Sequence, residues 1–227
     1  MLRRKGHFLP FPFPKGARRE NRDVVSIAEV DGQVHVASMK GRFVWPFRGE
    51  ASGRGHPQDG AGGFDDLRAL HAGPQGLLAG WRTHLEGGSG PGECIAFATW
   101  RGRVYAGSID GHLVEVDGPA IRRFESGGKG RPIRYMAAAH DRLWLAVDGR
   151  HHRWDGETWA SDAIEPYALH AAQGRLWALA RGGLWCSDAG DWPRRIDLDL
   201  VRPWSLGSRD DELWIGLKGG LVRAVLG

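Results

Sequence analysis

The chain has 227 residues, a formal net charge of +4 at pH 7 and 35 glycines, about twice the usual ~7 % share. Its 41 % hydrophobic and 26 % charged residues are the proportions of an ordinary folded domain, so collagen-like and globally disordered chains are excluded. No apolar run approaches the ~18 residues of a transmembrane helix, and prolines interrupt the apolar stretch that follows the basic first residues. We therefore expect a cytoplasmic protein without membrane insertion.

A short phrase recurs six times along the chain. Its copies occupy residues 33–37, 76–80, 103–107, 142–146, 175–179 and 212–216, and successive copies lie 27 to 43 residues apart. Each begins with a polar or glycine residue, continues with apolar residues and is rich in alanine or glycine near its end. Spacings of this size are typical of propeller blades.

Turn residues surround each copy. Asp31-Gly32 and Gln173-Gly174 precede the copies at 33–37 and 175–179, and Asp148-Gly149 and Arg181-Gly182 follow the copies at 142–146 and 175–179. Two-residue turns with glycine in second place suit type I′ hairpins, so each unit is predicted to contain three antiparallel strands joined by tight turns. The segments before the first turn are rich in small apolar residues, which predicts crowded innermost strands. We place their starts near residues 24, 67, 95, 133, 167 and 204.

These units predict one all-β domain over residues 1–227, a single β-propeller with six blades of mostly four antiparallel strands. The last blade ends at its third strand, so residues 7–13 are expected to pair with it and close the ring. Residues 48–66 are expected to form a glycine-rich insertion loop. A β-sandwich or an open meander is the alternative, but neither requires a phrase repeated in one internal register.

Two of the copies resemble a known repeat. Residues 175–185 read RLWALARGGLW and residues 212–221 read ELWIGLKGGL, which is similar to the LWIGT-x-x-GLY repeat of two-component-regulator type propellers. Members of that family are usually extracellular sensor domains, so the resemblance implies a blade first and a function second. A looser similarity links the chain to small stand-alone bacterial propellers that accompany MoxR-type ATPases, which implies an interaction subunit of a bacterial-type complex.

Residues 154–159 and 187–192 look like shortened versions of the Asp-box turn of sialidase-type propellers. That motif is a structural turn at the periphery of a blade, so it does not predict glycosidase chemistry. No GxSxG, HExxH or phosphate-binding loop motif is present.

The candidate site is the propeller face that carries the turns between second and third strands and the links between blades, because loops on a rigid scaffold commonly carry function. Arginine and aromatic residues make good interface anchors. The candidate contacts are Trp81, Arg82, His112, Arg150, His151 and Arg181. The bland alternative is that these are ordinary solvated turn residues.

Other site classes have weaker support. The histidines fall in different blades, and the adjacent His151 and His152 must point to opposite sides of a strand, so no metal site is predicted. The tryptophans recur at strand positions, which favours packing between blades over stacking on nucleic acid. Cys94 and Cys186 form no ligand or disulfide pattern and are expected to be two buried thiols. No cofactor and no catalytic residue is assigned.

The favoured function is a non-enzymatic protein-protein interaction module or scaffold subunit. One alternative is a carbohydrate-binding propeller lectin, which would need equivalent Trp/Arg pockets between successive blades. A second is a lyase or hydrolase with an active site at the mouth of the central channel, which would need polar side chains that converge there. The sequence leaves open the partner or ligand, the oligomeric state and the exact blade count.

Overall fold

The structure is a computed structural model. It describes residues 24–30, 33–38, 41–46, 56–57, 67–74, 76–81, 85–88, 90, 93–162, 164–180, 183–187, 194–196, 203–209, 212–217 and 220–225. The predicted closing strand, residues 7–13, lies outside this part, as does the predicted insertion loop 48–66 apart from residues 56–57.

The described residues form six antiparallel sheets of three or four strands and one small hairpin. The first three sheets are β1 (Val24–Val30), β2 (Gln33–Ser38), β3 (Gly41–Pro46) and β4 (His56–Pro57); β5 (Leu67–Gly73), β6 (Gly76–Trp81) and β7 (Leu85–Glu86); and β8 (Cys94–Trp100), β9 (Arg103–Ser108), β10 (His112–Glu115) and β11 (Ala120–Arg123). The hairpin is β12 (Glu125–Ser126) and β13 (Lys129–Gly130). The remaining sheets are β14 (Ile133–Ala139), β15 (Arg142–Val147), β16 (Arg150–Trp154) and β17 (Trp159–Asp162); β18 (Pro166–Ala172), β19 (Arg175–Ala180), β20 (Gly183–Ser187) and β21 (Arg194–Ile196); and β22 (Pro203–Arg209), β23 (Glu212–Leu217) and β24 (Gly220–Val225).

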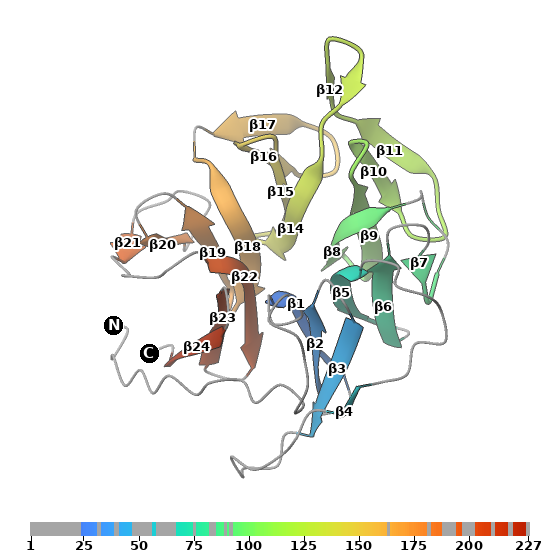
Figure 1. Cartoon of the computed structure of the whole chain (residues 1–227). Helices are drawn as coiled ribbons and strands as arrows, with labels where there is room; N and C mark the ends of the chain where they lie inside the picture. Colours follow the sequence, from blue (N-terminus) through green and yellow to red (C-terminus); the bar gives the residue numbers. More distant parts are fainter. Residues whose placement is uncertain are drawn as a thin grey trace.

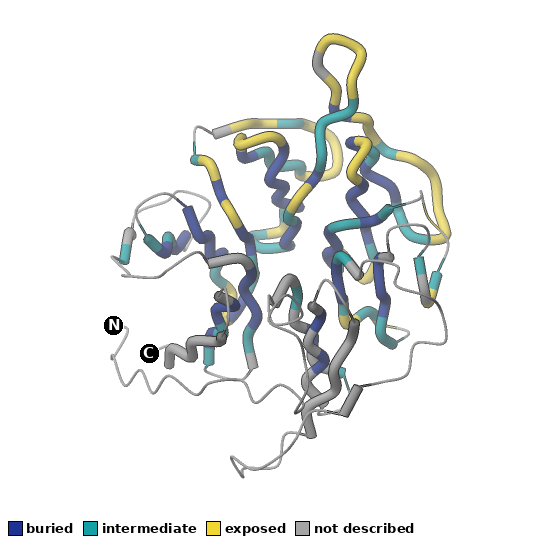
Figure 2. Tube along the Cα trace, in the orientation of Figure 1, coloured by how far each residue is buried: buried dark blue, intermediate teal, exposed yellow. Residues whose placement is uncertain are grey.

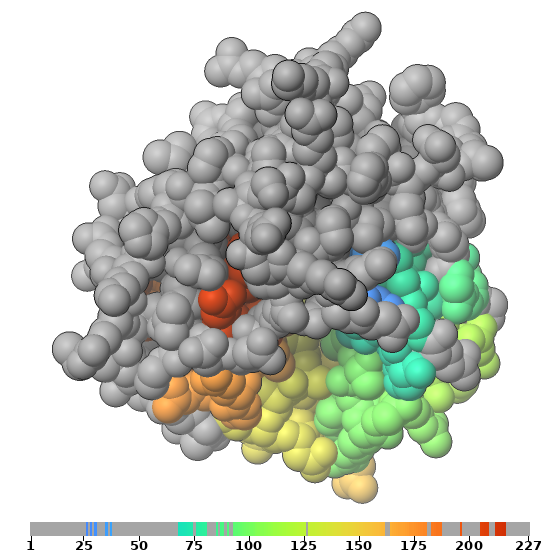
Figure 3. Space-filling view, turned by 90° about the horizontal axis from the view of Figure 1, so that it is seen from below, coloured from blue at the N-terminus to red at the C-terminus, as the bar shows by residue number. Residues whose placement is uncertain are grey.

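The six sheets are arranged around a common centre, with the first strand of each sheet nearest to it (Figure 1). The first strands pack against one another in the order β1, β5, β8, β14, β18 and β22, and β22 also packs against β1. In the space-filling view the described parts of the second to fifth sheets follow one another in chain order along one side of the molecule (Figure 3). This is the architecture of a β-propeller.

The repeated phrase forms the second strand of each sheet. In β15 and β19 every residue after the first is buried, because a neighbouring sheet covers each face of the strand. Trp144 is fully buried and its indole Nε1 donates a hydrogen bond to the carbonyl oxygen of Ala139 at 2.8 Å. Trp177 is also buried. These tryptophans pack between sheets, as their strand positions predicted.

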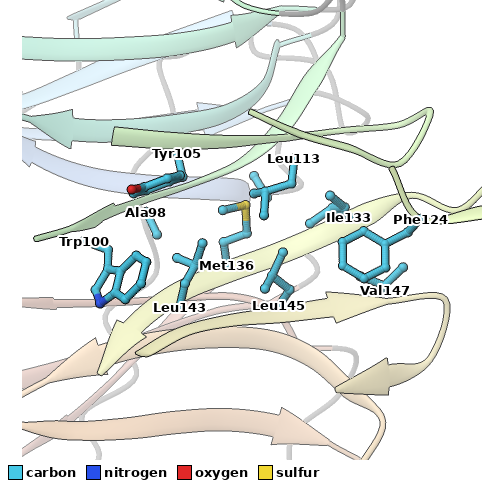
Figure 4. Close-up of a cluster of buried hydrophobic side chains, with 11 residues drawn as sticks. Ala98, Trp100, Tyr105, Leu113, Phe124, Ile133, Met136, Leu143, Leu145 and Val147 are labelled. Carbon is cyan, nitrogen blue, oxygen red and sulfur yellow. The ribbon is translucent and has the colours of Figure 1, made fainter. Parts of the chain in front are cut away.

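A hydrophobic cluster fills the space between the third and fourth large sheets. Leu113, Ile133, Leu143 and Leu145 are fully buried in it, and it includes Met136 from β14 (Figure 4). Its members come from both sheets, so packing across the interface holds the two sheets together. Burial of one such leucine contributes about 1.5–3 kcal/mol.

Small residues in the second strands permit the close approach of the next sheet. A Cβ atom at Gly107 would lie 2.6 Å from Cγ2 of Ile133 and 2.9 Å from Sδ of Met136. A Cβ atom at Gly80 would lie 2.2 Å from the carbonyl oxygen of Cys94. Both glycines are the fifth residues of their strands, which explains why the repeated phrase commonly ends in glycine or alanine.

The tight turns adopt the predicted left-handed backbone. Asp148 and Gly149 have φ angles of 47° and 73°, as a type I′ turn requires. His140 and Asp141 form an equivalent turn without glycine, with φ of 53° at both residues. Asp141 is held there by a two-point hydrogen bond from Arg101, whose guanidinium also lowers the pKa of the Asp141 carboxyl.

The turn after β16 has the side-chain hydrogen bonds of an Asp turn. Asp155 Oδ1 accepts hydrogen bonds from the backbone N–H groups of Glu157 and Thr158, and Oδ2 accepts one from the Thr158 hydroxyl at 2.7 Å. These donors hold the pKa of Asp155 well below its ordinary value. The second predicted Asp-box-like segment, 187–192, lies outside the described residues after Ser187.

Gly149→Val is expected to destabilise the fold, because a β-branched residue must then adopt a left-handed φ. That conformation costs about 1–2 kcal/mol for an L-residue, and each 1 kcal/mol lowers the melting temperature by roughly 2–4 °C in a chain of this size. Gly149→Asn is the matched control, since asparagine tolerates left-handed φ. Equal melting temperatures for the two variants, measured by circular dichroism, would contradict the turn assignment.

Candidate functional site

Two kinds of loop meet at one end of the strands. Because successive strands are antiparallel, the turns between second and third strands lie at the same end as the links into the next sheet. We call this end the loop face. The described part of it comprises the turn 109–111, the link 124–132 with the β12–β13 hairpin, the turn 148–149 and residues 164–167 before and at the start of β18.

The loop face carries exposed apolar side chains. Tyr167 is 44 % exposed and Ile109 is 36 % exposed, and they are the large hydrophobic residues exposed among those the structure describes. Ile109 lies in the turn between β9 and β10, and Tyr167 is the second residue of β18. Tyrosine is one of the residue types enriched at protein interfaces.

The β12–β13 hairpin stands out from the body of the molecule, and its tip is exposed (Figures 1 and 2). Its base is fixed by hydrogen bonds: the Phe124 N–H donates to the carbonyl of Gly111, and the Arg131 N–H donates to the carbonyl of Phe124, both at 2.8 Å. A Cβ atom at Gly130 would lie 2.1 Å from the carbonyl oxygen of Asp110, so the base packs tightly on the neighbouring turn. The hairpin is therefore presented on a rigid support.

The charges on the loop face are mixed. Arg131 pairs with Asp148 at 2.5 Å, and this contact links the hairpin to the next turn. Arg134 and Arg150 are exposed and have no ion pair with any residue that the structure describes. Asp110 and Glu165 are exposed on the same face. The face as described is therefore not a strongly basic patch, which would be expected for nucleic-acid binding.

Of the six predicted contacts, Arg150 and His112 are on the loop face. Arg150 is exposed, and His112 is half-buried with its backbone N–H donating to Ser108 Oγ at 3.0 Å. Arg82 and Arg181 lie outside the described residues, and for Trp81 only the backbone is described.

His151 is inside the protein, which corrects its choice as a surface contact. Its side chain has 0 % exposure, and its ring stacks on Trp144 at 4.8 Å between ring centroids. The alternation along β16 turns His151 toward the core and turns His152 toward Phe124. The sequence indicated that the two histidines point apart, but not which one points inward.

Sequence reasoning missed Ile109, Arg134 and Tyr167. Arg134 and Tyr167 are the second residues of neighbouring first strands, β14 and β18, a position that the repeated phrase does not include. Two signals in the sequence could have found them. Ile109 is an apolar residue inside a predicted turn, and Arg134 and Tyr167 are large residues at the start of strands that otherwise contain mainly small residues.

The Trp/Arg cluster between the third and fourth large sheets is not an open pocket. Trp159 stacks on Trp154 with ring centroids 5.5 Å apart, and the Arg122 guanidinium lies 4.6 Å from the Trp159 ring centroid. Arg122 also covers Phe124 at 4.8 Å. Because Trp154 and Arg122 already cover the Trp159 ring, this ring has no free face on which a sugar could stack. The cluster instead stabilises the contact between the two sheets.

Two histidines occupy equivalent positions in the first strands of opposite sheets. His71 is the fifth residue of β5, and His170 is the fifth residue of β18. Nε2 of His71 is 2.8 Å from the hydroxyl of Thr99, and Nε2 of His170 is 2.8 Å from the hydroxyl of Ser208. We call these four side chains the histidine belt. Burial lowers the pKa of both imidazoles to about 4, and the charge of His71 lowers that of His170 further.

Within the described residues, no three His, Cys, Asp or Glu side chains gather as a metal site would require. Cys94 and Cys186 are buried free thiols, and burial raises the pKa of Cys94 to about 11. No helix long and apolar enough to cross a membrane is found among the described residues.

No family model and no curated protein matches the chain. Among solved structures, it is similar to the extracellular domain of a putative hybrid two component system from B. thetaiotaomicron, with a TM-score of 0.65, 15 % identity and coverage of 93 % of this chain and 33 % of that one. Virginiamycin B lyase from Staphylococcus aureus has a TM-score of 0.65 and 10 % identity, and the match covers 100 % of this chain and 99 % of that one. The WD40 propeller domain of Doa1 has a TM-score of 0.62 and 13 % identity, over 98 % of this chain and 97 % of that one.

At these identities the likeness establishes the fold alone. The chain spans about a third of the length of the two component system domain. The class that fold and comparisons define is the β-propeller, all-β and built from antiparallel sheets.

Acid is expected to destabilise the fold between about pH 6.5 and pH 4. The unfolded histidines protonate near 6.5, whereas the folded pKa of His71 and His170 is about 4, so the unfolded state binds more protons across this window. Melting temperatures measured at several pH values between 7.5 and 4 report this loss of stability. The double variant His71→Gln and His170→Gln should have a flatter profile, and an unchanged profile would contradict the burial of the two neutral rings. The stability that the ionised Asp155 carboxylate contributes is lost only as the pH falls below 3.8, the ordinary pKa of this group.

Proposed function

We propose that the protein is a non-enzymatic interaction module, a cytoplasmic scaffold subunit of a bacterial-type complex that binds a protein partner through its loop face. The mechanism is rigid presentation of loops, without covalent chemistry. The resemblance of residues 175–185 and 212–221 to propeller repeats is consistent with this role.

The observation that carries the proposal is the location of the exposed apolar residues. Tyr167 and Ile109 both lie on the loop face, which also carries the exposed Arg134 and Arg150. Tyrosine and arginine are the residue types that most often dominate binding energy at protein interfaces. The hydrogen bonds at Phe124 and Arg131 fix the base of the β12–β13 hairpin, so the link that carries this hairpin is held in one position. Such preorganisation lowers the entropy cost of binding.

The proposal includes a detail of the fold: the propeller is a closed ring of six blades. In this ring, residues 7–13 supply the fourth strand of the last blade, beside β24. The contact of β22 with β1 supports the ring, since the last and first sheets are already neighbours. Ring closure would remove the open edge of β24 and so protect it from edge-to-edge association.

Deletion of residues 1–13 is therefore expected to lower the melting temperature and promote self-association. Deletion of residues 1–5 is the control, because it leaves the proposed closing strand in place. Unfolding and light scattering compare the two, and a chain lacking residues 1–13 that is as stable and monomeric as the full chain would contradict the closure.

The partner-binding proposal is tested by affinity purification from the native host, with quantitative mass spectrometry of co-purified proteins. Tyr167→Ala and Arg134→Glu are expected to reduce recovery of the true partner at least tenfold, the loss expected for an anchor worth about 1.4 kcal/mol or more. Arg142→Glu is the charge-matched control, since Arg142 begins β15 at the opposite end of the strands.

Circular dichroism of each variant keeps loss of binding distinct from loss of folding. A partner recovered equally with all three variants would contradict the loop face as the binding surface. A partner lost only with Arg142→Glu would instead place the interface at the opposite end.

An enzyme is the second candidate, favoured by the histidine belt and by the fold shared with virginiamycin B lyase. A catalytically inactive variant of that lyase, with one histidine replaced by alanine, also has this fold. Polar side chains on the first strands of opposite sheets are what a channel active site would use. Turnover of virginiamycin B or quinupristin that is abolished in His71→Gln would favour this candidate. For the lectin alternative, the Trp159 ring offers no free face, because Trp154 and Arg122 already cover it.

A further inference from the structure

Each first strand carries a β-bulge at its second residue. The pairing register with the second strand of the same sheet shifts between the first and third residues of β1, β5, β8, β14, β18 and β22. A bulge leaves one extra residue without a cross-strand partner and re-aims its side chain. These extra residues lie at the loop-face end of the strands. We call them the bulge set: Val25, Arg68, Ile95, Arg134, Tyr167 and Trp204.

Two members of the bulge set are exposed on strands that are otherwise covered. Tyr167 is exposed between the buried Pro166 and Ala168 of β18. Arg134 is exposed beside the buried Ile133 of β14. β14 packs against β8 and β18, and β18 packs against β14 and β22, so regular side chains of these strands face a neighbouring sheet. The two exposed side chains therefore lie outside those interfaces, at the loop-face end.

Apolar residues occupy the strands on both sides of Arg134. The strands β8, β14 and β18 follow one another around the common centre, and their bulge residues are Ile95, Arg134 and Tyr167 (Figure 1). Ile95 is half-buried. Ile109 is tied to the start of β8, because its backbone N–H donates to the carbonyl of Glu93 at 3.2 Å. The bulge set thus has an arginine on the strand between those that carry an isoleucine and a tyrosine.

The charges of the bulge set are positive only. Its two ionisable members are Arg68 and Arg134, and it contains no acidic residue. Arg68 already pairs with Glu93, with Nε and Oε1 3.5 Å apart. Arg134 has no ion pair with any residue in the part of the chain that the structure describes. An exposed guanidinium presents a planar fork of donors that matches the two oxygens of a carboxylate.

Acidic residues elsewhere on the loop face disfavour a polyanion. Asp110 and Glu165 are exposed there, and Glu165 lies two residues before Tyr167. Asp148 is paired with Arg131. A chain of phosphates that crossed this face would meet like charges, whereas a single carboxylate at Arg134 would not have to pass them. The charge pattern therefore favours a protein segment with an isolated acidic side chain over nucleic acid.

We propose that the bulge set recognises a segment of the protein partner in which a carboxylate lies next to a large apolar side chain. This inference rests on the proposed function and names the chemistry of the partner. The carboxylate accepts two hydrogen bonds from the Arg134 guanidinium, and the apolar side chain packs on the exposed Tyr167. Tyrosine and arginine are the residue types that most often act as anchors in such contacts.

Selection of random peptides displayed on phage, with the immobilised full chain as target, tests this chemistry. Peptides enriched over the bare matrix are expected to carry Asp or Glu adjacent to an aromatic or large aliphatic residue. A parallel selection on Arg134→Glu is expected to lose the enrichment in acidic residues, because like charges then oppose binding. Failure to enrich any peptide, or equally acidic peptides from both targets, would overturn the proposal.

Fluorescence anisotropy of one selected peptide then compares variants. Arg134→Glu and Tyr167→Ala should each weaken its binding at least tenfold. Arg134→Lys should weaken it less, because lysine keeps the charge but loses the two-point geometry. Arg142→Glu, at the opposite end of the strands, is the charge-matched control, and circular dichroism verifies the folding of each variant. An unchanged affinity in Arg134→Glu would overturn the proposal.

The same measurements separate this inference from the loop face itself. Binding that is insensitive to Arg134→Glu but is lost in Ile109→Ala and Arg150→Glu would keep the loop face and overturn recognition by the bulge set. Binding lost only in Arg142→Glu would contradict both. A fluorescent poly(dT) oligonucleotide that binds more tightly than the peptide, and is lost in Arg134→Glu, would replace the peptide with nucleic acid.

Discussion

The structure depends on the close packing of neighbouring sheets at their first and second strands. The second strands β15 and β19 are buried on both faces, so their side chains must fill the space between neighbouring sheets without forcing them apart. At Gly107 there is no room even for a methyl group, because Ile133 and Met136 of the next sheet occupy that position. Interiors packed to this density tolerate few changes in volume, and this tightness makes the sheets a rigid support for loops.

Repetition explains how much of the fold can be predicted. Turn pairs such as Asp148-Gly149 have the backbone conformation that their residue types require, and Trp144 and Trp177 are buried where their spacing indicated. The Asp155 turn is equally local, because all its hydrogen bonds are made within four residues. A local pattern is sufficient for features of this kind.

Contacts between distant residues were not predictable in the same way. Nothing in the sequence indicates that His71 meets Thr99 or that His170 meets Ser208, since these pairs form only when two sheets pack. The inward orientation of His151 depends on which side of β16 faces Trp144. The His140-Asp141 turn lacks the glycine that marks most of the others, and Arg101 stabilises it from a different sheet. The candidate site was predictable as a face but not as a set of residues.

The loop face is the surface that we propose for recognition, and the turns between first and second strands lie at the opposite end of the same strands. The central claim concerns the loop face, and hydrogen–deuterium exchange of the purified complex with its protein partner tests it most directly. The account predicts protection on binding at residues 109–112, 125–134, 148–150 and 164–167, with no change at the turns 101–102, 140–141 and 173–174. Protection confined to those three turns, at the opposite end, would contradict it.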